Sequence, residues 1–259
     1  MNKATPKIRL SIKKLSKSFA ENKVLNEIDM DVYDKESLVI LGGSGSGKSV
    51  LIKTIVGLME PDSGGIYYDG TDVTNLSNRS RGNLMSRFGF LFQGGALFDS
   101  LRVWENIAFY LLHNKYLAIS EAKEIAVKKL QAVGLTSEVL YKYPSELSGG
   151  MQKRVALARA IANDPEVIFF DEPTTGLDPI MSNVINNLIC QVRKSLNTTT
   201  ITITHDINSA KSIATRVAML YKGKIVWVGS VGQMYKSDNE VFDQFINGRI
   251  DGPIKIGLK

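Results

Sequence analysis

The apolar positions form short runs in the first third of the chain. Near alternation over 24–32 and an unbroken apolar run over 37–41 predict two strands, and helical spacing follows over about 48–58. Turn-rich strands are expected around 64–69, and another apolar run covers 88–92. This part of the chain is therefore expected to be mostly β-structure around one helix.

Helical spacing replaces these runs between about residues 94 and 163, and strand-like runs then return. The expected helices of this stretch are 103–112, 120–133 and 149–163. The later expected strands are 167–170, 199–204, 217–221 and 224–228, with helices near 180–196 and 207–214 between them. Strands alternating with helices predict an α/β fold with a mainly parallel sheet and a helical insertion.

Charge alone does not identify a partner. The chain has 32 Lys and Arg against 26 Asp and Glu, a formal charge of +6 that suits a polyanion or a membrane surface. Residues 1–24 hold seven of the cations and one acid, which is typical of a solvated edge hairpin protected by lysines.

Composition excludes several other classes. No run approaches the 18 or so apolar residues that span a bilayer, and the N-terminus lacks the apolar stretch of a signal peptide, so we expect a cytosolic chain. The single cysteine, Cys190, cannot form an intrachain disulfide or a cysteine-based zinc cluster. With only His113 and His205, a histidine-rich metal site is not expected either.

A glycine-rich segment directly follows the apolar run 37–41. It fits the pattern G-x-x-x-x-G-K-[ST] and consists of Gly42, Gly43, Ser44, Gly45, Ser46, Gly47, Lys48 and Ser49. Glycines allow the backbone N–H groups to surround phosphate oxygens, and the N-terminus of the next helix favours the same anion. Lys48 is expected to reach the β- and γ-phosphates of a nucleotide, and the Ser49 hydroxyl to bind Mg²⁺.

Two carboxylates follow the apolar run 167–170. A buried strand that ends in Asp places a carboxylate beside the metal of a P-loop fold, so Asp171 is expected to hold Mg²⁺, largely through water. Glu172 is expected to orient the attacking water or accept its proton. His205 follows the run 199–204 and is expected to contact the γ-phosphate or hold the water, whereas His113 has no such context and is interpreted as structural.

These segments, together with Leu147–Met151 and Thr175–Asp178, stand in the order seen in the nucleotide-binding subunits of ABC transporters, which the chain resembles over about residues 8–246. The resemblance implies a P-loop NTPase (RecA-like) core with an antiparallel β edge and a helical insertion. It also implies a head-to-tail homodimer that hydrolyses ATP with Mg²⁺. The implied division is 1–93 with 164–246 as the core, 94–163 as the helical subdomain and 247–259 as a tail.

Further roles come only from this resemblance. Ser148, Gly149 and Gly150 are expected to contact the ATP bound by the second copy, and Asp178 to act across the dimer. Gln93 is expected to contact Mg²⁺ and the water, and Phe19 to stack on adenine. At Met151 the chain departs from the usual Gln.

A narrower resemblance is carried by Leu91–Leu101, Val103–Ile107, Leu147–Met151 and Phe245–Pro253, which look like the ATPases of the Mla/Mce group. That group implies phospholipid transport that maintains outer-membrane lipid asymmetry, a membrane permease as partner, a place on the cytoplasmic side of the inner membrane and a small STAS-type regulatory subunit. An apolar cluster is a candidate surface for the permease; it consists of Leu97, Phe98, Leu101, Val103 and Trp104.

Three alternatives stay open. The chain fits an ABC ATPase for another substrate, and its positive charge permits an ABC ATPase that acts on nucleic acid. Such proteins usually carry paired cassettes, coiled coils or zinc modules, and the chain shows none of these patterns. A P-loop kinase of small molecules would leave Leu147–Met151 unexplained.

Overall fold

The computed structural model describes residues 6–255, which pack into two compact units. The first unit comprises Met1–Arg81 and Ile203–Lys259, and the second comprises Gly82–Thr202. Helix α2 (Asn78–Met85) and strand β8 (Thr199–Thr204) lie across the two division points. The two units are defined by contacts within each unit and not by function. The functional division at 93/94 and 163/164 therefore stays a prediction.

An antiparallel sheet in the order β2-β1-β4-β5 opens the first unit. Its strands are β1 (Ile8–Phe19), β2 (Asn22–Tyr33), β4 (Ser63–Tyr68) and β5 (Thr71–Asp72). Ile12 pairs with Met30 on one side and with Ile66 on the other, and all three side chains are buried. One face of this sheet therefore belongs to the hydrophobic core.

The basic segment was expected to form a solvated hairpin at a sheet edge. β1 and β2 do form a hairpin at one end of the sheet, with β2 as the edge strand and the lysine-rich β1 between β2 and β4. Acids on the neighbouring segments pair with cations of β1. Arg9 contacts Asp34 and Asp69, each at 2.6 Å, and Lys17 contacts Asp62 at 2.8 Å. The excess positive charge of this segment is thus partly neutralised within the first unit.

A second group of strands in the first unit carries the glycine-rich segment. β3 (Ser37–Leu41) pairs in parallel with β9 (Arg216–Tyr221), and β10 (Lys224–Ser230) pairs with β9 in the antiparallel sense. All five residues of β3 are buried, as expected for a strand covered on both faces. Helices α1 (Lys48–Ile55), α7 (Ile207–Ile213) and α8 (Glu240–Asn247), with the 3₁₀ helix η3 (Val231–Lys236), complete the unit.

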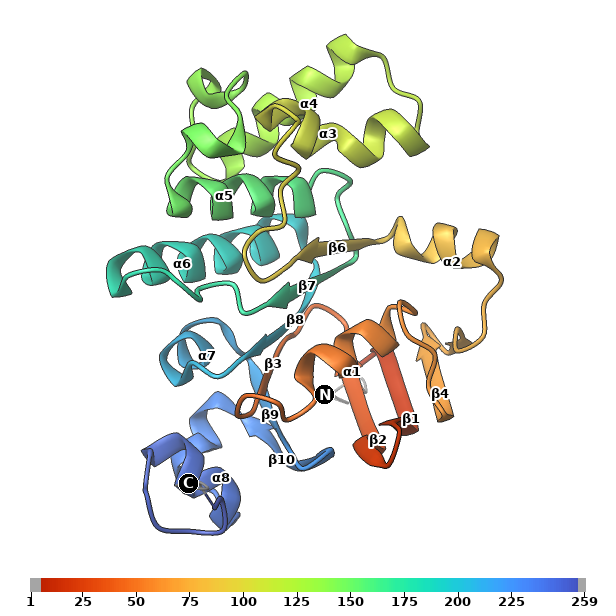
Figure 1. Ribbon diagram of the computed structural model, residues 1–259, viewed down its shortest axis with the longest axis vertical. Helices are drawn as coiled ribbons and strands as arrows, with labels where there is room; N and C mark the ends of the chain where they lie inside the picture. Colours follow the sequence, from red (N-terminus) through yellow and green to blue (C-terminus); the bar gives the residue numbers. More distant parts are fainter. Residues whose placement is uncertain (1–5, 256–259) are drawn as a thin grey trace, which may run out of the picture. The chain divides into compact units, whose positions relative to one another are not determined.

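The second unit combines two parallel strands with a set of helices (Figure 1). β6 (Phe88–Leu91) pairs with β7 (Val167–Asp171), with Phe90 opposite Phe169. Helices α3 (Val103–Asn114), α4 (Ile119–Ala132) and α5 (Gly149–Ala160) contact one another, and α6 (Pro179–Leu196) follows β7. Two 3₁₀ helices, η1 (Ser137–Val139) and η2 (Pro144–Glu146), connect α4 to α5.

Most predicted strands and helices agree with the structure to within a few residues, and two helices were missed. α2 contains no buried residue, so it leaves no apolar pattern in the sequence. α8 does have apolar spacing, with Phe242 and Ile246 buried and Asn239 accepting the capping hydrogen bond of the Phe242 N–H. The apolar spacing of α8 was therefore present in the sequence, but it covers only eight residues.

Candidate functional site

The glycine-rich segment of the first unit forms a tight loop between β3 and α1. Gly45 and Gly47 have φ angles of 71° and 101°, a region that other residues avoid. At Gly47 a Cβ would also lie 3.0 Å from the Val24 carbonyl oxygen. The loop conformation therefore needs glycine at the position before the helix begins.

Lys48 lies inside this loop rather than on the surface. Only 8% of the residue is exposed, and its Nζ donates to the carbonyl oxygens of Gly42 (2.7 Å) and Gly43 (3.0 Å). α1 begins at Lys48 without an acidic residue in its first turn, which leaves the helix N-terminus favourable to an anion. The positive charge is thus held at the centre of the loop.

A buried hydroxyl marks the same loop as a place for a polar ligand. Ser46 Oγ is buried and has no hydrogen-bond partner among the described residues. Ser49, one residue into α1, is exposed. An orphaned hydroxyl, an ammonium group and a helix N-terminus together fit phosphate oxygens.

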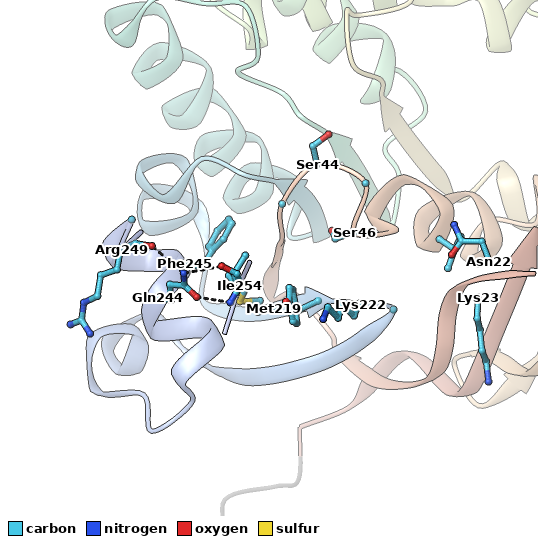
Figure 2. A pocket seen from close by; sticks show the side chains of 16 residues that line it. Asn22, Lys23, Ser44, Ser46, Met219, Lys222, Gln244, Phe245, Arg249 and Ile254 are labelled. Atoms are coloured by element: carbon cyan, nitrogen blue, oxygen red, sulfur yellow. Dashed lines mark hydrogen bonds between the residues drawn. The ribbon is translucent and has the colours of Figure 1, made fainter. Parts of the chain in front are cut away.

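A cavity of about 630 Å³ opens beside the loop. Figure 2 shows the side chains that line it. Its lining includes Gly43–Ser46, the Asn22–Val24 turn and the Tyr221–Gly223 turn between β9 and β10. The remaining wall is formed by α8 and the segment after it, including Gln244 and Ile254. The segment Phe245–Pro253 entered the prediction only through a family resemblance that gave it no place in a site, so this wall was not expected.

Gln244 attaches the C-terminal segment to α8. The side chain is 4% exposed, and its Nε2 donates to the carbonyl oxygens of Arg249, Ile250 and Ile254 at 3.1–3.3 Å. Its Oε1 accepts a hydrogen bond of 2.7 Å from the Ile254 N–H, and Figure 2 marks the hydrogen bonds of Gln244 with Arg249 and Ile254. A single amide thus fixes the path of the chain along this side of the cavity.

Phe19, the residue expected to stack on adenine, ends β1 with 45% of its surface exposed. The Lys17 Nζ lies 5.9 Å from the centre of its ring. The ring is not part of the cavity lining. Phe19 is therefore a surface aromatic rather than a core residue, and its contact with a base stays a prediction.

Two acidic residues end β7 in the second unit. Asp171 is the last strand residue, and Glu172 follows with φ of 48° and only 8% of its surface exposed. The Thr175 hydroxyl donates to Glu172 Oε2 at 3.2 Å. The left-handed backbone at Glu172 ends the extended conformation of β7 directly after Asp171.

Asp178 ends the loop that follows these carboxylates and caps α6. Its side chain accepts a hydrogen bond of 2.9 Å from the Met181 N–H, and Pro179 occupies the first helical position. Asp178 itself is exposed. An exposed capping carboxylate is compatible with the expected role across a dimer, which stays a prediction.

Ser148 caps α5 in the same unit. Its Oγ accepts from the Met151 N–H at 3.3 Å, so the Met that replaces the usual Gln contributes through its backbone. Gly149 is exposed, and the position where a Cβ would stand has no neighbour within 4 Å. No acidic residue lies in the first turn of α5, so this helix N-terminus also favours an anion.

The two remaining predicted site residues, Gln93 and His205, each follow a strand. Gln93 is exposed just after β6, and Gly94 with φ of 79° follows it. His205 is exposed directly after β8. His113 is exposed on α3 with its ring 4.5 Å from that of Phe109, and its structural interpretation stays a prediction.

Each unit therefore holds part of the predicted set. The glycine-rich loop, Phe19 and His205 belong to the first unit, and Gln93, Ser148–Gly150, the β7 carboxylates and Asp178 to the second. Within residues 6–255 no group of three or more His, Cys, Asp or Glu side chains is placed to hold a metal ion by itself. A search of the same residues for a helix that could span a lipid bilayer finds none.

Comparison with known proteins identifies the class of this cassette. Residues 25–175 match the family described as ABC transporter, and the chain belongs to that family. Solved relatives agree: a dimeric ATP-binding cassette, MJ0796, bound to ADP and Pi superposes with a TM-score of 0.78 at 29% identity. That comparison covers 86% of this chain and 98% of the other. The fold is thus that of an ABC ATPase, as the sequence predicted.

Two relatives that the chain matches over most of its length are named as transport ATP-binding proteins. The chain is 38% identical to the intermembrane phospholipid transport system ATP-binding protein MlaF of Haemophilus influenzae, over 95% of this chain and 93% of the relative. It is also 38% identical to a probable ribonucleotide transport ATP-binding protein, mkl, of Mycobacterium leprae, over 95% of this chain and 71% of the relative. These two relatives are named for different substrates.

Proposed function

We propose that the chain is the ATP-hydrolysing subunit of an ABC transporter, a homodimeric motor that powers a membrane permease for phospholipids. The observation that carries the ATPase assignment is the loop in which Lys48 is buried beside the orphaned Ser46 hydroxyl at the start of α1. Family membership supports the same activity. The protein would lie peripherally on the cytoplasmic side of the inner membrane.

ATP fits the first unit through its phosphates. The N–H groups of residues 42–47 and the Lys48 ammonium bind the β- and γ-phosphate oxygens, which replace the carbonyl contacts of Lys48 seen in the structure. Ser49, Gln93 and Asp171 supply oxygen ligands of the kind that Mg²⁺ prefers. When bound, Mg²⁺ neutralises charge that develops on the phosphates.

Hydrolysis depends on the carboxylate that follows Asp171. Glu172 orients the attacking water and accepts its proton, and its burial keeps competing water away from the carboxylate. His205 donates a hydrogen bond to a γ-phosphate oxygen. This arrangement brings residues 1–93 and 164–246 together as the core, with 94–163 as the helical subdomain and 247–259 as the tail.

Two copies arranged head to tail complete each site. The Ser148 hydroxyl and the N–H groups at the start of α5 form a second anion site, which faces the triphosphate held by the other copy. Asp178 communicates across the interface and Phe19 stacks on adenine. ATP therefore closes the dimer, and hydrolysis removes the bridge and opens it.

The permease is expected to dock on the second unit, over an apolar hollow of about 500 Å³. Phe92 and Phe98 line it and are 39% and 44% exposed, and Arg159 closes one side by donating to the carbonyl oxygens of Gly95 and Ala96. Such a hollow suits a short helix with an apolar face.

The cluster predicted for this role is only partly available. Val103 and Trp104 are 0% and 8% exposed, so they belong to the core of the second unit. Phe98 remains accessible, and Leu97 and Leu101 are half-buried. The docking surface is therefore centred on phenylalanines rather than on the start of α3. A small STAS-type subunit is a further expected partner.

A transport assay distinguishes the phospholipid assignment from its alternatives. The chain is purified with its permease, reconstituted into vesicles, and supplied with ATP and either a fluorescent phospholipid or a radiolabelled ribonucleotide. ATP-dependent movement of the phospholipid alone supports the proposal, and movement of the ribonucleotide alone contradicts it. Glu172→Gln in the same complex is the matched control. Because this variant should bind ATP without hydrolysing it, any movement that it still supports does not depend on hydrolysis.

A further inference from the structure

A buried lysine on α5 has no assigned role. Lys153 is 5% exposed, and its Nζ is buried without a hydrogen-bond partner among the described residues. Lysine is almost never fully buried unless a negative charge compensates it. A compensating group is therefore expected close to Lys153.

The packing of α5 shows where Lys153 points. A Cβ at Gly89 of β6 would collide with the carbonyl oxygen of Ala160, so the end of α5 lies directly on β6. Gly89 pairs with Ile168 of β7. Only six residues connect Ala160 to β7, so α5 runs back along the strand toward its carboxyl end.

Helix and strand dimensions then place Lys153 near the end of β7. Seven residues of helix from Ala160 to Lys153 cover about 10 Å. Three residues of strand from Ile168 to Asp171 cover a similar length, about 10 Å. The start of α5 is held on the same side, because Gly150 packs against Met181 at the beginning of α6.

The electrostatics agree with this placement. Burial lowers the pKa of Lys153, and the charges of Asp171 and Glu172 act in the opposite direction. Both carboxylates therefore lie within electrostatic range of the ammonium group. Like charges on adjacent residues repel, and a fixed cation reduces that repulsion.

We propose that Lys153 is a positioning residue for Asp171 and Glu172, a built-in cation that holds the two carboxylates in place from α5. This proposal rests on the proposed function for its catalytic consequence. Lys153 lies five residues after Ser148, so one helix carries both the expected contact to the second copy's ATP and the cation beside this copy's own carboxylates.

Steady-state kinetics supply the first test. Lys153→Met keeps the length of the side chain and removes the charge, and we expect kcat to fall about tenfold while KM for ATP stays within twofold. Lys153→Arg keeps the charge and should retain at least about a third of kcat. Lys128→Met, on the exposed face of α4, is the matched control. A wild-type kcat in Lys153→Met would overturn the proposal.

A thermal cycle without nucleotide separates electrostatics from packing. The melting temperature is measured for the wild type, Lys153→Met, Glu172→Gln and the double variant. Lys153→Met should lower the melting temperature by about 2–4 °C more in the wild-type background than in the Glu172→Gln background. The neutral amide of the Glu172→Gln variant carries no charge for the Lys153 ammonium to stabilise. Equal shifts in both backgrounds would show a packing role only and overturn the proposal.

The two measurements also keep the proposals distinguishable. A wild-type protein without ATPase activity contradicts the proposed function, and the thermal cycle still tests the interaction of Lys153 with Glu172. Should Lys153→Met fail to fold, Lys153→Gln replaces it in the same cycle with Lys153→Arg as the charged reference.

Discussion

Gly150 and Met181 pack so closely that a Cβ at position 150 would lie 2.9 Å from the Met181 sulfur. Met181 is also the residue whose N–H is capped by Asp178. The first turn of α5 and the first turn of α6 are thus held against each other. The segment expected to contact the second copy's ATP therefore rests on the loop that carries the carboxylates.

Gly150→Ala tests this contact. Because the opposing atoms end a flexible methionine side chain, the variant should fold, with a melting temperature within a few degrees of the wild type. Displacement of the α5 N-terminus should weaken ATP-dependent dimerisation about tenfold, as measured by analytical ultracentrifugation. Gly82→Ala, in helix α2, is the matched control for a new methyl group, since a Cβ there would meet no atom within 4 Å and position 82 lies outside the predicted site.

Lys48→Ala should lose affinity for ATP itself. Removing a charge-assisted contact to phosphate costs on the order of 1.5–3 kcal/mol, which corresponds to a rise in Kd of about 10- to 150-fold. Binding of a fluorescent ATP analogue measures the change. Lys53→Ala, on the exposed side of α1, should bind as the wild type does. An unchanged Kd for Lys48→Ala would contradict the phosphate assignment.

Glu172→Gln should bind ATP and hydrolyse it at least about 100-fold more slowly, because the amide cannot accept the proton of the water. The dimer should then persist in ATP, as size-exclusion chromatography would show. Glu124→Gln, on the exposed face of α4, is the control. Hydrolysis near the wild-type rate would remove Glu172 from the catalytic role.

Phe98→Ser should weaken binding of the permease by about tenfold and leave the ATPase activity of the isolated chain unchanged. Phe98 is exposed and packs on Phe109, with ring centres 4.6 Å apart. Copurification of the chain with the permease measures the effect. Tyr116→Ser removes an aromatic ring that is 87% exposed elsewhere in the second unit and should bind normally.

Asp62 gives the first unit a measurable dependence on pH. Hydrogen bonds from the Lys17 ammonium and the Ser18 N–H lower the pKa of Asp62 below its ordinary value. A lowered pKa adds stability above the ordinary value, and that stability is lost as the pH falls through the lowered one. Asp62→Asn should therefore melt slightly below the wild type at pH 7, and the difference should disappear progressively below about pH 4.

Buried runs and motifs made most of the fold predictable. The apolar segment 37–41 is β3 and the run before Asp171 is β7, since strands buried on both faces leave continuous apolar sequence. Helix α1 ends at Ile55 rather than near 58, because Gly57 turns to φ of 74°. Helix ends depend on such local turns, which apolar periodicity does not report.

The candidate site was predictable only where a motif names it. Lys48 and Glu172 lie in motifs, so both were proposed as site residues from the sequence, and their roles stay predictions. Lys153 resembles any surface lysine of a polar helix, and Gln244 lies just before Phe245–Pro253, a segment whose family resemblance assigns Gln244 no role. Their burial results from packing between segments far apart in the sequence, which no local pattern contains.

At the left-handed position of Glu172, the residue that would give the most stable fold differs from the residue that ATP hydrolysis is proposed to need. A backbone with φ of 48° is less strained with aspartate than with glutamate, because residues with a short polar side chain adopt the left-handed region more readily. Yet aspartate would withdraw the carboxylate by one methylene from the water that Glu172 is proposed to orient. The chain thus retains the more strained acid at this position, and a search for stabilising substitutions alone would select a protein that no longer works as a motor.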